Sequence, residues 1–166
     1  MSKQTFSSVG YDLWQIVNEV EPDLKRISDV DAFARPHPTK WSKKEILGHL
    51  VDSASNNHQR FVRGVQGKGG AFPSYDQDFL VKLQHTNEVE WPVLIALWSS
   101  YNRFLAHVLS MLPPEAAEYS CTLGADESGG KPITLLFIAS DYVEHLKHHM
   151  NQILGRRYST TYGAKA

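Results

Sequence analysis

Apolar residues recur along this chain at intervals of three and four residues, the spacing of amphipathic helices. Four long segments carry the pattern, and it predicts helices over about 8–27, 42–65, 88–112 and 135–154. A short helix is expected near 77–83, between the second and third. Pro22 lies inside the first segment and is expected to kink or divide it. The buried stripe of that segment is expected to be Leu13, Trp14, Val17, Val20, Leu24 and Ile27.

Capping residues mark two of the helix starts. Ser42 can accept a hydrogen bond from the backbone of Glu45, whose side chain can reach back to Ser42, which makes a capping box. Thr134 can cap the last helix, and Gly155 is expected to stop it. The turn-rich stretch 115–132 has room for a short extended pair. Since no convincing run of strands accompanies the helices, the pattern predicts an all-α four-helix bundle.

Composition narrows the class of protein. The chain has 166 residues, of which 42% are hydrophobic and 21% charged, as expected for one globular domain. Its net charge of -1 and scattered basic residues argue against a nucleic-acid partner. No apolar stretch is typical of a signal peptide or a membrane span, so we expect no membrane association and a cytoplasmic protein. Cys121 is the single cysteine, which excludes an internal disulfide and a cysteine-based metal site.

Three of the eight histidines lie close together in the last predicted helix. His145 and His149 are one helical turn apart, so both imidazoles can reach one ion. His148 is expected to be exposed or just outside such a set. Leu146 stands where the HExxH metalloproteases need a glutamate, which excludes that class. Taken alone, a histidine pair of this spacing is more typical of a solvated helix face than of a metal site.

A third ligand from another helix would change that interpretation. His49 lies at the edge of the buried stripe of the second helix. His58 is the competitor, but it lies about 13 Å further along the helix axis, so one ion could not take both. His37, His85 and His107 are expected to be structural or surface residues.

Two motifs resemble the DinB-like superfamily, which includes thiol-dependent S-transferases. "WSKKEILGHLVDSASNNHQRF" is similar to its W-S-x-x-E-x-L-x-H-L pattern, and "DYVEHLKHHMNQILG" is similar to its H-x-x-x-H near the chain end. The resemblance implies one domain over residues 1–166, a four-helix bundle with up-down-down-up topology. It also implies a metal held by His49, His145 and His149.

Three imidazoles leave coordination positions open, as catalytic metal sites do. The expected cofactor is a divalent ion, with zinc or nickel favoured and the identity left open. The resemblance implies an enzyme acting on a small-molecule substrate, by transfer of a low-molecular-weight thiol to an electrophile or by hydrolysis. The alternatives are a non-catalytic metal-binding stress-response protein, and a bundle whose histidines bind no metal.

Five further polar residues are candidates around the histidines. Asp52 and Asp141 are near enough in sequence to orient the imidazoles, since metal-bound histidines need hydrogen-bond acceptors on their other nitrogen. Asn56, Asn102 and Gln152 are candidates for substrate contact. Because bundles of this size often pair through exposed helix faces, we also expect a homodimer.

Overall fold

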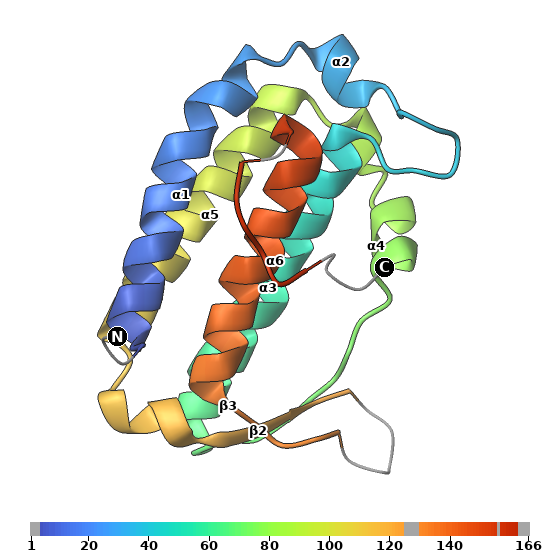
Figure 1. Cartoon of the computed structure of the whole chain (residues 1–166). Helices are drawn as coiled ribbons and strands as arrows, with labels where there is room; N and C mark the ends of the chain where they lie inside the picture. Colours follow the sequence, from blue (N-terminus) through green and yellow to red (C-terminus); the bar gives the residue numbers. More distant parts are fainter. Residues whose placement is uncertain (1–3, 125–129, 156, 163–166) are drawn as a thin grey trace.

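The computed structural model describes residues 4–124, 130–155 and 157–162 (Figure 1). The structure has four long helices, which are α1 (Phe6–Arg26), α3 (Lys43–Gln66), α5 (Trp91–Met111) and α6 (Leu135–Leu154). Helix α1 packs against α5 and α6, and α3 packs against the same two helices. α1 and α6 run in one direction while α3 and α5 run in the other (Figure 1), so the predicted four-helix bundle with up-down-down-up topology is confirmed.

The connection from α3 to α5 must return along the whole bundle, because these two consecutive long helices run in the same direction. It holds a strand, a short helix and a 3-10 turn. The short helix has the bounds that the sequence predicted. These elements are β1 (Gly70–Phe72), α4 (Gln77–Leu83) and η1 (Thr86–Glu88).

A small three-stranded sheet closes one end of the bundle (Figure 1). After the 3-10 turn η2 (Pro114–Glu118), β2 (Ser120–Leu123) pairs antiparallel with β3 (Ile133–Thr134). An extended pair was expected within 115–132, and the second strand lies just beyond that stretch. Residues 125–129 of the same stretch lie outside the described part. The parallel partner of β2 is β1, which was not predicted, because three residues are too few to show a strand period.

Three details differ from the sequence prediction. α1 is one helix through Pro22, with Val20 and Leu24 buried on either side of it. Trp14 is 46% exposed and stacks on Tyr11, since its neighbour Leu13 takes the inward position one helical step away. The connection between α1 and α3, where no helix was predicted, contains the short helix α2 (Asp29–Phe33), which begins where the Ser28 hydroxyl accepts a hydrogen bond from the backbone N–H of Asp31.

One hydrophobic core joins the four long helices. Trp91 and Trp98 are buried in it, and the Trp91 indole donates a hydrogen bond to the Leu24 carbonyl, 2.9 Å away. Cys121 is also buried, which raises the pKa of its thiol and disfavours a nucleophilic role. Within the described ranges, no helix combines the length and the apolar character needed to cross a membrane.

Candidate functional site

The position of His49 is set by the start of α3. The Ser42 hydroxyl accepts from the Glu45 backbone and the Glu45 carboxylate accepts from the Ser42 backbone, at 3.1 and 2.8 Å. The Arg35 guanidinium also donates to this carboxylate, with its Nε 2.9 Å from Oε2. His49 follows one turn later and is 1% exposed. The predicted capping box therefore begins the helix that carries the imidazole into the bundle.

His145 and His149 project from α6 toward His49. The Nε2 atom of His145 lies 3.2 Å from Nε2 of His49 and 3.0 Å from Nε2 of His149. The ligand nitrogens of the three residues all lie within 4.8 Å of one another. Two imidazole nitrogens on one tetrahedral zinc, each at about 2.0–2.1 Å, would be about 3.3 Å apart. The spacing of the three residues thus fits one small divalent ion.

The outer nitrogens of the two α6 histidines face polar side chains. Nδ1 of His149 donates to the Gln152 amide oxygen at 2.8 Å, which leaves Nε2 of His149 unprotonated and free to bind an ion. Nδ1 of His145 lies 3.5 Å from the Ser53 hydroxyl. Nδ1 of His49 is buried and has no hydrogen-bond partner among the described residues.

Burial keeps all three imidazoles neutral. Desolvation, followed by the neighbouring His149, lowers the pKa of His49 from 6.5 to about 4. Desolvation and the adjacent histidines lower the pKa values of His145 and His149 to about 3. Metal ligands must be neutral imidazoles, so this environment prepares the donor set near neutral pH without competition from protons.

Two aromatic rings pack against the cluster. Trp41, which precedes the cap of α3, lies 5.2 Å from the His49 ring, centre to centre. Tyr162 lies 5.5 Å from the His145 ring and 5.8 Å from that of His148. Tyr162 was not predicted as a site residue, because nothing in its local pattern shows that the chain folds back onto α6.

The segment that delivers Tyr162, residues 157–162, is called here the C-terminal strap. It runs back beside α6 (Figure 1) and is held by Asn151, whose side chain exchanges hydrogen bonds of 2.8 Å with the backbone of Tyr158. At its end, the Tyr162 hydroxyl donates to Asp141, 2.8 Å from both carboxylate oxygens. Burial and the carboxylate raise the pKa of Tyr162, so the phenol stays protonated as a donor.

The five polar candidates divide into two groups. Gln152 contacts His149, and Asp141 reaches the cluster through Tyr162. The side chain of Asp52 accepts from Gln84 at 2.9 Å and makes no hydrogen bond to a histidine among the described residues. Asp52 comes three residues after His49, so the two side chains are about 60° apart around the α3 axis. This offset is enough for Asp52 to meet Gln84 instead of the histidines.

Among the described residues, neither asparagine candidate makes a hydrogen bond to the three imidazoles. Asn56 donates to the backbone carbonyl of Asp52, one turn earlier in α3, at 2.9 Å. Asn102 is buried in the core, where it donates to the Trp98 carbonyl and accepts from the Tyr142 hydroxyl. Both hydrogen-bond patterns are structural.

The other histidines are outside the cluster or at its edge. Nδ1 of His58 lies 3.1 Å from the Tyr101 hydroxyl on α5, so this histidine is occupied elsewhere, as its distance along α3 predicted. His148 is half-buried, and the Gln152 amide nitrogen donates to it at 3.1 Å. His37, His85 and His107 are exposed.

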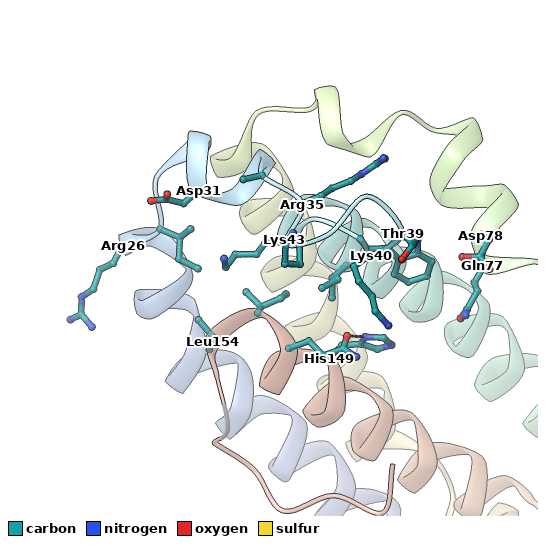
Figure 2. Close-up of a pocket in the computed structure, with 17 residues that line it drawn as sticks. Arg26, Asp31, Arg35, Thr39, Lys40, Lys43, Gln77, Asp78, His149 and Leu154 are labelled. Carbon is teal, nitrogen blue, oxygen red and sulfur yellow. Dashed lines mark hydrogen bonds between the residues drawn. The ribbon is translucent and has the colours of Figure 1, made fainter. Parts of the chain in front are cut away.

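One cavity borders the cluster at His145 and another borders it at His149. A small one of about 160 Å³ opens on His145 and is lined by the strap residue Tyr162 as well as by Arg60 and Tyr75. A large one of about 1080 Å³ opens on His149 and Gln152 (Figure 2). Figure 2 shows Arg26 and Asp31 at one end of it, Gln77 and Asp78 of α4 at the other, and Lys40 and Lys43 between them.

Comparison with known proteins supports this fold. A family model described as the DinB superfamily matches residues 13–153. A solved structure, YfiT from Bacillus subtilis, superposes with a TM-score of 0.79 at 19% sequence identity, covering 92% of this chain and 86% of that one. Its description is a probable metal-dependent hydrolase with an unusual four-helix bundle topology. No curated protein matches the sequence.

Proposed function

The chain belongs to the DinB superfamily, and we propose that it is a metal-dependent enzyme whose divalent ion is held by His49, His145 and His149. The observation that carries the proposal is the convergence of three neutral Nε2 atoms at 3.0 and 3.2 Å. Buried polar groups are normally hydrogen-bonded, yet the three Nε2 atoms face one another and Nδ1 of His49 has no partner among the described residues, an arrangement that a bound ion would explain.

The surroundings of the three histidines favour catalysis over a purely structural ion. Among the described residues, the metal-capable group consists of these three side chains with no cysteine or carboxylate as a fourth member. Structural zinc sites are normally closed by four protein ligands, whereas catalytic sites have three and an open position. A cavity of about 1080 Å³ reaches one of the ligands, which gives a small molecule access to the site.

The reaction we propose is nucleophilic attack on a small electrophilic substrate. A divalent ion at such a site would lower the pKa of a bound water or thiol, so that a hydroxide or thiolate is present near neutral pH. Hydrolysis and transfer of a low-molecular-weight thiol both use this chemistry. The chain's own residues hold the imidazoles: Gln152 fixes the tautomer of His149, and Tyr162 packs against His145.

Metal analysis of untagged protein tests the proposal. We expect about one zinc or nickel ion per chain, and a loss of bound ion in the His49→Ala and His149→Ala variants. His58→Ala is the matched control, because it removes a histidine of the same helix that contacts Tyr101. Metal-free and reconstituted protein are then compared on ester, amide and thiol–electrophile pairs. Equal metal content in all variants would overturn the site, and an inert reconstituted protein would favour the non-catalytic alternative.

We also propose that the protein forms a homodimer through α5. Exposed apolar side chains follow one side of α5 at intervals of four and seven residues, which is the spacing of a single helix face. A face of this kind is typical of helix–helix association. Light scattering of the purified protein tests the expectation, and a mass of one chain would refute it. The residues concerned are Val93, Leu97, Phe104 and Met111.

A further inference from the structure

A small molecule has more room to reach the three histidines from the side of His149 than from the side of His145. On the side of His145 the adjoining cavity holds only about 160 Å³ and is walled by Tyr162, whose hydroxyl is fastened to Asp141. On the side of His149 the cavity is about 1080 Å³. Ligand pockets are typically about 300–1,000 Å³. A substrate that meets the proposed ion therefore occupies the cavity beside His149.

Two of the four basic side chains that line this larger cavity already form ion pairs. Arg35 is bound to Glu45, and Arg26 is paired with Asp23. Lys40 and Lys43 have no ion pair among the described residues. The cavity thus holds two guanidinium groups that are already neutralised and two ammonium groups that are available.

Both lysines line the cavity from the start of α3. Lys40 ends the loop before α3, and Lys43 is the first residue of that helix, three positions later. In Figure 2 the end of the Lys40 side chain is turned toward the His149 imidazole, whereas the Lys43 side chain extends toward the end of the cavity where Arg26 and Asp31 lie. The capping box fixes the start of α3 and so fixes where both side chains begin.

We infer that the cavity selects a substrate with an anionic oxygen group, a carboxylate or a phosphate, which Lys40 and Lys43 bind while the reacting end lies at the histidines. This rests on the proposed function and adds a substrate class to it. Asp31 and Asp78 line opposite ends of the cavity and direct an anion toward the lysines between them. Charge attraction in so open a site is moderate and weakens with salt.

The test uses a thiolate to anchor a probe at the ion and varies only the far end of the probe. A series of ω-mercaptocarboxylates of three to six carbons is compared with the matching mercaptoalcohols on metal-loaded protein, and dissociation constants are measured. An exposed ion pair is worth up to about 1 kcal/mol, or about fivefold in affinity. Because two lysines are involved, we expect the mercaptocarboxylates to bind about tenfold more tightly than the mercaptoalcohols. Salt at 0.5 M should reduce this preference.

The double variant Lys40→Gln/Lys43→Gln should bind acid and alcohol equally. Lys131→Gln, an exposed lysine in the connection before β3, is the control and should keep the preference. A preference that survives in the double variant would come from chelation of the ion by the carboxylate, and it would overturn the inference. The absence of any preference in the original protein would do the same.

A second measurement separates this inference from the proposed function. Inorganic phosphate is titrated into metal-free protein while the indole N–H signal of Trp41, which also lines the cavity, is followed by NMR. We expect a shift that is lost in the double variant and kept in Lys131→Gln. A protein that binds no metal but shows this shift refutes the metal site and keeps the anion site. A protein that binds metal but shows neither phosphate shift nor acid preference refutes the anion site alone.

Discussion

The Nδ1 atom of His149 lies 2.8 Å from the amide oxygen of Gln152, one turn further along α6. This hydrogen bond decides which nitrogen of His149 carries the proton. It places the free lone pair on Nε2, beside Nε2 of His145. The same amide donates to His148, so one side chain connects a proposed ligand with the histidine next to it.

Replacing Gln152 should therefore weaken metal binding without removing a ligand. We expect Gln152→Ala to lower the affinity about 10- to 100-fold, as loss of a partner of a metal-bound histidine does. Gln152→Glu should retain the affinity, because a carboxylate is also an acceptor for Nδ1–H. Competition with a chromophoric chelator measures both. Asn56→Ala is the control, since Asn56 bonds only to the α3 backbone, and an equal loss there would contradict the role of Gln152.

Tyr162 should contribute in two separable ways. Tyr162→Phe removes the hydrogen bond to Asp141 but keeps the ring beside His145, so we expect a loss of about 1–2 kcal/mol in the free energy of unfolding and little change in metal affinity. Tyr162→Ala also removes the ring and should weaken metal binding. Urea unfolding and chelator competition on both variants give the comparison. Identical metal affinities for Phe and Ala would show that the ring does not position His145.

The metal-free protein should lose stability as the pH falls below 6.5. The three imidazoles have folded-state pKa values of about 3 to 4 against 6.5 in the unfolded chain, so the unfolded state binds more protons between these limits. Stability therefore rises with pH through this window, by up to about 1.4 kcal/mol per pH unit for each histidine. Urea midpoints from pH 4 to 7 measure the slope. His49→Leu should reduce it, and an unchanged slope would assign the acid sensitivity to other groups.

The capping box at the start of α3 should matter for both fold and site. The Ser42 hydroxyl accepts from Glu45 and donates to Asn87 at 2.6 Å. We expect Ser42→Ala to cost about 1–2 kcal/mol of unfolding free energy, since it removes the cap and the second hydrogen bond together. Thermal or urea unfolding measures the loss. The exposed Ser55 of the same helix, changed to Ala, should cause no loss, and a similar effect there would argue against the cap.

Local signals in the sequence determined the four long helices and α4, but not α2. The periodicity of apolar residues predicted α4 and α6 with the bounds that the structure has, and the capping box located the start of α3 to the residue. These features depend on neighbours three or four positions apart, which a linear pattern records. The same spacing placed His145 and His149 on one side of a helix, and the family resemblance added His49 from another.

Tertiary structure decided everything that joins distant segments. Only the packing of α3 against α6 brings Nε2 of His49 and His145 to 3.2 Å across 96 positions of the chain. The parallel pairing of β1 with β2 and the return of the strap to place Tyr162 at His145 have no local signal either. Asp52 shows the same limit, since its side chain met Gln84 of a distant segment. The sequence by itself therefore determined the four long helices, α4 and the candidate ligands, whereas the orientation of each imidazole and the cavity beside His149 depend on contacts between elements, which only the folded chain defines.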